Sequence, residues 1–170
     1  MEKLFKEVDP VEINENVFHL INDTWFLLTA GTLTNFNTMT ASWGSLGILW
    51  NKPVAFAFVR PQRHTYGFME QAERFTLSFL SEEYRPALKY CGKYSGRDVD
   101  KILNTGLIPL GTKNGSVTFE QSSLVLECRK LYFSDLDASH FLDPKIIKNY
   151  PLNDFHRMYI GGIEHCLVKK

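Results

Sequence analysis

Three polar segments interrupt an otherwise apolar sequence, and the first runs from Asn35 to Trp43. It places hydroxyl, carboxamide and backbone N–H groups close together and contains no charged residue. Such groups suit the edge of a planar heterocycle that carries imide groups, or a phosphate. The same residues also fit a strand with one polar face, or a turn held by Ser and Thr hydroxyls, and neither of these structures needs a ligand.

The second polar segment, residues 60–65, reads Arg-Pro-Gln-Arg-His-Thr and directly follows an apolar run. Its two arginines stand three residues apart, next to Thr65 at the expected start of a helix. A helix N-terminus offers N–H donors and a guanidinium offers a planar fork of donors, so the segment is suited to bind an anion. The alternative is a solvated loop whose arginines pair with acidic residues on the surface.

The third polar segment, residues 95–101, reads Ser-Gly-Arg-Asp-Val-Asp-Lys. Its simplest interpretation is a helix start, in which Ser95 or Asp98 is the cap, the acidic residues oppose the helix dipole and Lys101 lies further along. The functional alternative places Ser95 or Lys101 against a phosphate or the edge of an isoalloxazine ring.

No constellation for acid–base, nucleophilic or metal-dependent catalysis emerges from the sequence. The five histidines are scattered, and there is no HExxH, GxSxG, phosphate-binding Walker loop or GxGxxG after a strand. The three cysteines are widely spaced and have no metal-ligand spacing, so we expect buried or half-buried thiols, with a catalytic thiolate as the alternative. Any redox chemistry would therefore have to come from an organic cofactor.

Strands supply most of the elements that must position these segments. The runs with strand character are residues 25–30, 53–59, 75–80, 116–120, 124–133 and 158–168. Within residues 124–133, alternation places Leu124, Leu126 and Cys128 on one face and Glu127 and Arg129 on the other.

Short helices are expected at three places, about 65–71, 82–90 and 98–104. Gly67 weakens the first helix, and Gly106 stands where the third should stop. Residues 140–150 mix loop and short helix, and Gly161-Gly162 predicts a bend or bulge in the last strand. Many short strands with a few helices predict a mainly β fold, a β-barrel with short helices.

Length, composition and charge indicate one globular domain over residues 1–170, with 44% hydrophobic and 22% charged residues. The 19 basic and 19 acidic residues cancel, which makes a nucleic acid an unfavourable partner. No apolar run is long enough for a membrane span, and the N-terminus has no apolar signal core, so we expect a cytoplasmic protein without membrane contact.

Taken together and in order, these motifs resemble the flavin reductase-like family of FMN-binding split barrels, and its flavoredoxin branch in particular. The resemblance rests on residues 37–43, 50–55, 60–65, 75–79, 95–101 and 156–163. It implies a six-stranded Greek-key split barrel that forms a homodimer, with FMN bound near the subunit interface.

The resemblance also implies which residues bind FMN. The Thr- and Ser-rich segment would contact the flavin through Asn37, Thr38, Met39, Thr40, Ser42 and Trp43. The Arg-Pro-x-Arg-x-Thr segment would hold the phosphate and ribityl chain through Arg60, Arg63 and Thr65, with Gln62 and His64 in lesser roles. The third segment would contribute Ser95, Gly96 and Lys101. Trp43 and Tyr159 would cover the ring, and any of these contacts could come from the partner subunit.

The function implied is that of a flavoprotein oxidoreductase that moves hydride or electrons from NAD(P)H through FMN to a protein or small-molecule acceptor. The protein would place and tune the flavin, so no catalytic side chain and no metal are expected. Two alternatives stay open. One is an FMN-binding electron carrier without NAD(P)H turnover of its own, and the other is a split barrel that binds a different ligand or serves only as a structural dimer.

Overall fold

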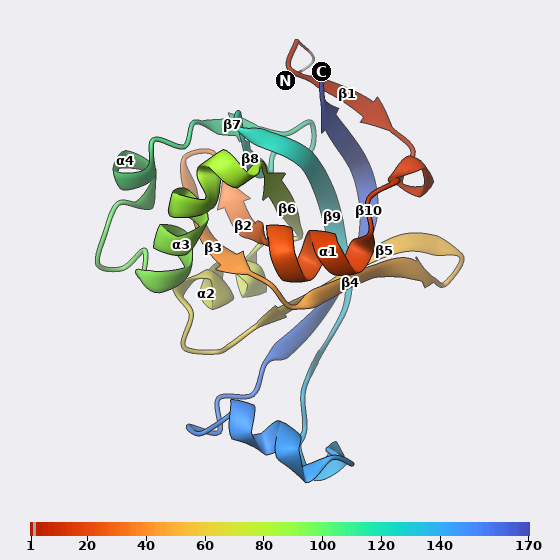
Figure 1. Ribbon diagram of the computed structural model, residues 1–170, viewed down its shortest axis with the longest axis vertical. Coiled ribbons are helices and arrows are strands. Elements are labelled where there is room, and N and C mark those ends of the chain that lie inside the picture. Colours follow the sequence, from red (N-terminus) through yellow and green to blue (C-terminus); the bar gives the residue numbers. More distant parts are fainter. Residues whose placement is uncertain (2) are drawn as a thin grey trace.

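The computed structural model describes residues 1 and 3–170, and within them eight antiparallel strands form one curved sheet (Figure 1). Their order is β3-β2-β6-β9-β10-β5-β4, and β1 pairs with β10. The strands of this sheet are β1 (Phe5–Val8), β2 (Phe26–Thr32), β3 (Asn35–Ala41), β4 (Gly44–Leu49), β5 (Lys52–Val59), β6 (Arg74–Leu80), β9 (Ser122–Asp135) and β10 (Arg157–Lys169). A separate small hairpin pairs β7 (Pro109–Gly111) with β8 (Val117–Phe119).

The mainly β fold with short helices is therefore confirmed. β4 lies at one end of the sheet order and β1 pairs with β10, so the sheet contains eight strands where six were expected. The bulge expected at Gly161-Gly162 is present, because the pairing of β10 with β9 shifts between Ile160 and Gly161. A Cβ at Gly161 would lie only 2.6 Å from Phe75 Cζ, so a residue without a side chain is needed here.

Two groups of buried side chains hold the sheet and its helices together. Phe26, Leu28 and Phe75 belong to the larger group inside the curved sheet. Leu27 and Leu88 belong to the smaller group, which packs the other face of β2 against the helices. Because adjacent residues of a strand point to opposite faces, β2 is covered on both sides.

Short helices pack around the sheet, and two of them contact β2 and β3. The helices are α1 (Val17–His19), α2 (His64–Gln71), α3 (Arg85–Lys93) and α4 (Lys101–Thr105). α2 begins one residue earlier than expected, and Arg63 rather than Thr65 is its N-cap. A 3-10 turn at Glu82–Tyr84 precedes α3, so the helix expected at 82–90 is split and runs further.

The N-cap of α4 is not one of the two residues that were expected. Asp100, not Ser95 or Asp98, caps this helix by accepting a hydrogen bond from the Leu103 N–H. Gly106 ends the helix with a φ of 68°, as its position in the sequence indicated. The third polar segment is therefore mostly a loop, and its Ser95 to Val99 portion is free to line a surface pocket.

Residues 136–156 leave the sheet between β9 and β10 as an arm that projects away from the barrel (Figure 1, light blue). The arm holds 3-10 turns at Ala138–His140 and Pro144–Asn149, which agrees with the mixed structure expected there. Among the residues that the structure describes, no helix combines the length and apolar character that crossing a membrane requires.

Candidate functional site

The three polar segments meet beside β3, at the N-terminus of α2, where they line adjoining pockets. The first, the Trp43 pocket, has a volume of about 150 Å³ and is lined by Met39, Thr40, Ala41, Ser42, Trp43, Phe58, Arg60, Arg63 and His156. The second, the Ser95 pocket, has a volume of about 320 Å³ and is lined by Asn37, Met39, Gln62, Arg63, His64, Thr65, Lys93, Tyr94, Ser95, Arg97 and Lys101. Because Met39 and Arg63 line both, the two pockets are neighbours.

A third, wider pocket continues from the Ser95 pocket along the loop before α4. This Gly96 pocket has a volume of about 640 Å³ and shares Asn37, Arg97 and Lys101 with the Ser95 pocket. Thr38 and Gly96 line it as well. Every residue that the resemblance assigned to the cofactor therefore lines one of the three pockets, with the exception of Tyr159.

Tyr159 was wrongly expected to cover a ring in this site. It pairs with Ala57 on β5 and points into the barrel core, where it is 1% exposed. Its neighbour Met158 pairs instead with Phe58, which lines the Trp43 pocket. Because adjacent residues of a strand point to opposite faces, the Met158 and Tyr159 side chains lie on opposite faces of the sheet. Burial raises the pKa of Tyr159 to about 12.

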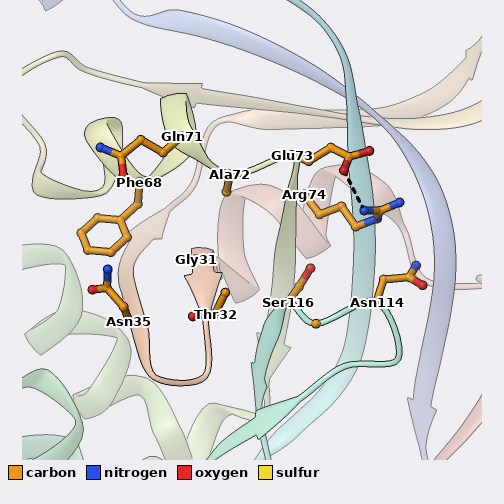
Figure 2. Close-up of a pocket in the computed structure, with 11 residues that line it drawn as sticks. Gly31, Thr32, Asn35, Phe68, Gln71, Ala72, Glu73, Arg74, Asn114 and Ser116 are labelled. Carbon is orange, nitrogen blue, oxygen red and sulfur yellow. Dashed lines mark hydrogen bonds and ion pairs between the residues drawn. The ribbon is translucent and has the colours of Figure 1, made fainter.

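A fourth pocket lies at the opposite end of α2 and gathers none of the expected residues (Figure 2). It has a volume of about 290 Å³ and lies between the β2–β3 turn, the end of α2 and the segment before β8. In Figure 2 the Phe68 ring lies near Asn35, and Arg74 extends toward Asn114. Arg74 is ion-paired with Glu164 at 2.7 Å and with Glu73 at 3.1 Å, so its charge is already balanced.

The buried ammonium of Lys101 joins the first and third polar segments. Its Nζ donates to the carbonyl oxygen of Thr38 at 2.7 Å and to that of Cys91 at 2.9 Å. Burial lowers the pKa of Lys101, and the two carbonyl contacts compensate the buried charge. Lys101 therefore holds β3, the end of α3 and α4 together, besides lining the pockets.

A second set of contacts joins β3 to α2. Asn37 Nδ2 donates to Thr65 Oγ1 at 2.6 Å, and Thr65 is fully buried. A Cβ on Gly96 would lie 2.0 Å from Asn37 Oδ1, so the loop can approach Asn37 only because this residue is glycine. The Thr40 hydroxyl donates to the Leu88 carbonyl of α3 at 2.5 Å. These side-chain contacts hold the first polar segment in place, and most of this segment forms the strand β3, which was one of the interpretations of the sequence.

Arg60 is held by the arm. Its guanidinium is ion-paired with Asp154 at 2.7 Å, donates to the carbonyl of Asn149 at 2.9 Å and lies over the Tyr150 ring. Gln62 also donates to Asp154. The hydrogen bond from Arg60 holds the pKa of Asp154 below its ordinary value. The positive charge of Arg60 is therefore balanced within the chain.

Arg63 and Arg97 are placed differently. Both line the Ser95 pocket, where Arg63 donates to the Gly92 carbonyl at 2.9 Å and Arg97 to the Gln62 carbonyl at 3.2 Å. Neither is ion-paired with a carboxylate within the described residues. The N-terminus of α2 opens onto the same pocket and has no side-chain cap. Guanidinium groups and uncapped N–H groups on one pocket form a site for an anion.

The Trp43 pocket is aromatic and holds a histidine that the sequence reasoning did not assign. The rings of His156 and Trp43 lie 5.0 Å apart, and His156 Nδ1 is 2.9 Å from the hydroxyl of Tyr150. Burial, with the nearby Arg60, lowers the pKa of His156 to about 4. The imidazole is therefore neutral at pH 7. In the sequence, only its position at the start of the motif at residues 156–163 indicated a role for His156 in the site. Arg97, which was also not assigned, was indicated only by its position within the third polar segment.

His64 is also disfavoured as a cation. Burial lowers its pKa, and the charges of Arg97 and Lys101 lower it further. Its ring packs edge-on against Phe68, with centroids 5.2 Å apart. His64 is thus a neutral, partly packed side chain on the rim of the Ser95 pocket.

The three cysteines are buried free thiols, which confirms the first of the two interpretations. Burial raises the pKa of Cys91 and of Cys166 to about 11, and raises that of Cys128 as well. A reactive thiolate is therefore disfavoured at each position.

Fold and pockets together define a β-barrel in which a cationic pocket adjoins an aromatic one. The family model of the flavin reductase like domain matches residues 18–170, so the chain belongs to that family. A comparison with curated proteins found no match.

Solved structures of the same fold include several flavin proteins. An FMN-binding domain of a flavin reductase-like enzyme from Shewanella baltica is similar, with 17% identity, a TM-score of 0.69 and coverage of 96% of this chain and 76% of that one. The flavoredoxin of Desulfovibrio vulgaris has 18% identity, a TM-score of 0.67 and coverage of 95% and 76%. An NADH:FAD oxidoreductase of Streptomyces globisporus, in complex with NAD and FAD fragments, has 13% identity, a TM-score of 0.64 and coverage of 86% and 77%. At these identities the likeness establishes the fold.

The low pKa of His156 predicts a pH dependence of stability. Because the folded pKa of about 4 lies below the ordinary value of 6.5, the unfolded chain takes up this proton first as the pH falls. The contribution is present above pH 6.5 and is lost between pH 6.5 and about 4. We expect urea unfolding of the His156→Gln variant to depend less steeply on pH over this window, by at most one proton. An NMR titration midpoint of His156 near 6.5 would contradict the assignment.

Proposed function

We propose that this protein is an FMN-dependent oxidoreductase that takes electrons from NAD(P)H and passes them to a protein or small-molecule acceptor. The observation that carries the proposal is the pair of guanidinium groups, Arg63 and Arg97, at the uncapped N-terminus of α2. A phosphomonoester such as that of FMN carries about −1.5 to −2 charges at neutral pH and matches this arrangement. Membership of the flavin reductase like family supports the same ligand.

Two of the adjoining pockets suit the two ends of FMN. The Ser95 pocket would hold the phosphate through Arg63, Arg97 and the N–H groups of α2. The adjoining Trp43 pocket would hold the ring, with Trp43 and Phe58 as apolar walls. Most of the site residues that the resemblance assigned would thus divide between an anion-binding part and a ring-binding part, while Thr38 and Gly96 line only the Gly96 pocket.

FMN, when bound, supplies the redox chemistry by accepting a hydride from the nicotinamide and giving up electrons to the acceptor. The chain's own residues orient and shield it. Trp43 and Phe58 would form apolar walls beside the ring, and the neutral His156 adds no charge there. Arg60 places a guanidinium on the same pocket, with Asp154 fixing its orientation.

A second copy of the chain is proposed as the partner. Ile48 and Trp50 at the β4–β5 turn and Tyr132 on β9 are exposed, and the Trp50 and Tyr132 rings lie 6.5 Å apart. Grouped exposed apolar side chains of this kind are typical of protein interfaces.

Light scattering tests this dimer. The unmodified protein should have the mass of two chains, and Trp50→Glu should shift it toward one by placing a charge in the interface. Phe18→Glu, which changes an exposed aromatic residue elsewhere, is the control and should stay dimeric. A one-chain mass for the unmodified protein contradicts the proposal.

Replacement of the two unpaired arginines tests the phosphate site. Arg63→Ala and Arg97→Ala should each weaken FMN by about 1.5–3 kcal/mol, the value of a hydrogen bond to a charged group, and leave riboflavin almost unchanged. Arg60→Ala should instead weaken both ligands alike, because Arg60 is ion-paired with Asp154 and borders the ring pocket. Fluorescence titrations with both flavins measure these losses, and Arg129→Ala serves as a control because Arg129 lines none of the Trp43, Ser95 and Gly96 pockets. Equal losses of FMN and riboflavin in the Arg63 variant would remove Arg63 from the phosphate site.

An absorption spectrum recorded without oxygen tests the reaction itself. We expect purified protein to bind FMN and its flavin bands to bleach rapidly when NADH or NADPH is added. Bound flavin that stays oxidised would favour an electron carrier that is reduced by another protein. Protein that takes up no flavin would leave a barrel that binds some other ligand.

A further inference from the structure

The helix α2 presents its N-terminus to the Ser95 pocket, yet its own sequence does little to stabilise it. It has only eight residues, Gly67 lies in its interior, and no side chain of the described residues caps its N-terminus. Helices this short are unstable on their own, and glycine is a weak helix former. A Cβ at Gly67 would meet no heavy atom of the described chain within 4 Å, so close packing does not require the glycine. α2 therefore depends on contacts with the rest of the chain.

Lys130 of β9 holds the C-terminal end of α2. Its Nζ donates to the carbonyl oxygen of Met69 at 2.5 Å and to that of Glu70 at 3.2 Å. Both carbonyls belong to the last turn of the helix, where a carbonyl has no partner within the helix and a cation complements the helix dipole. The same ammonium lies 5.8 Å from the centre of the Tyr159 ring. The Lys130 N–H also donates to the Glu73 carbonyl just beyond α2, at 3.0 Å. β9 thus anchors α2 where the helix ends.

Arg157, the first residue of β10, holds α2 from the side. Its Nη1 donates to the Glu70 carboxylate at 2.9 Å, while its Nε and Nη2 donate to the two oxygens of Asp135 at 2.7 and 2.8 Å. Its guanidinium lies over the rings of Tyr66 and Phe133, 5.2 and 4.8 Å from their centres. Tyr66 and Glu70 are four residues apart, so they share one face of α2, and Arg157 contacts this face. Because Asp135 ends β9 and pairs with Arg157, the helix is tied to the base of the arm.

We propose that Lys130 and Arg157 are positioning residues for the phosphate of the flavin, and that they act by keeping α2 helical. This inference rests on the proposed function, since it assumes that the phosphate binds at the N-terminus of α2. Neither residue lines the Trp43, Ser95 or Gly96 pocket, so neither would touch the ligand. The N–H groups of the first turn converge on an anion only while the turn is helical. A site that is formed for part of the time binds its ligand more weakly by that fraction. The two residues therefore increase the affinity for the phosphate and not for the ring.

A Lys130→Met variant tests the contact at the end of the helix, because methionine keeps the apolar stem and removes the donors. It should weaken FMN about fivefold and change riboflavin, which has no phosphate, less than about twofold in fluorescence titrations. Lys169→Met is the matched control. Lys169 also donates to a backbone carbonyl, that of Glu120, but it lies at the opposite end of β10 from Arg157. This control should leave the affinity for both flavins unchanged.

A Glu70→Gln variant tests the contact with Arg157 at a half-exposed carboxylate of α2. It removes the charge that Arg157 pairs with and leaves the Glu70 carbonyl in place for Lys130. We expect it to weaken FMN about twofold and to leave riboflavin unchanged. The same variant keeps the proposal testable if Lys130→Met does not fold.

A Gly67→Ala change separates positioning from a merely structural role, because alanine favours the helix by about fivefold over glycine. In the unmodified protein it should change FMN affinity little, since Lys130 and Arg157 already keep α2 formed. Combined with Lys130→Met or Glu70→Gln, it should restore most of the lost affinity for FMN. Amide hydrogen exchange without ligand should agree, with residues 68–72 exchanging faster in Lys130→Met and slower again in the double variant.

Three results would overturn the proposal. They are an unchanged FMN affinity in Lys130→Met and Glu70→Gln, equal losses of FMN and riboflavin, and double variants in which Gly67→Ala restores nothing. Each of these results requires that the unmodified protein binds FMN, so it contradicts this inference alone. Unmodified protein that binds no FMN contradicts the proposed function, and this inference with it.

Discussion

The buried ammonium of Lys101 is the contact on which the assembly of the candidate site depends. Lysine is almost never buried unless its donors are satisfied, and here the carbonyl oxygens of Thr38 and Cys91 satisfy two of them. One carbonyl belongs to β3 and the other to α3, while Lys101 itself begins α4. A single side chain thus fixes the distance between strand, helix and loop. The Ser95 and Gly96 pockets are spaces that this spacing leaves open.

The distribution of charge around the site follows from the sheet topology. β5 pairs with β10, so the end of β5 lies beside the point where the arm returns to the sheet. Arg60 follows β5, and Asp154 stands just before β10, and the two are therefore brought together. Arg63 and Arg97 come from α2 and from the loop before α4, where no acidic side chain is brought into an ion pair with them by the described residues. The barrel thus separates a balanced arginine at the Trp43 pocket from two arginines at the Ser95 pocket that have no ion pair within the described residues.

Much of this arrangement could be predicted from the sequence, and the failures have identifiable causes. Strand periodicity was sufficient to predict a mainly β fold, and the family resemblance carried by the polar segments assigned residues that, with the exception of Tyr159, line the three pockets. They could not determine which face Tyr159 occupies, because the bulge at Gly161-Gly162 and the pairing of β10 with two strands set that register. They also could not separate Asp100 from Ser95 and Asp98 as a cap, since Ser and Asp both cap helices well.

The segment at residues 35–43 shows why a strand and a ligand site were both reasonable interpretations. β3 is at one end of the sheet order, so it pairs with β2 along one edge and leaves the other edge open. An open edge normally attracts another chain, and proteins cover it. Here Lys101 Nζ donates to the carbonyl of Thr38, and the hydroxyl of Thr40 donates to the Leu88 carbonyl of α3. The chain itself therefore covers part of this edge. Met39 lines both the Ser95 and the Trp43 pocket, which lie along the remainder. The strand therefore pairs with β2 along one edge, while residues of the same strand line the Ser95 and Trp43 pockets.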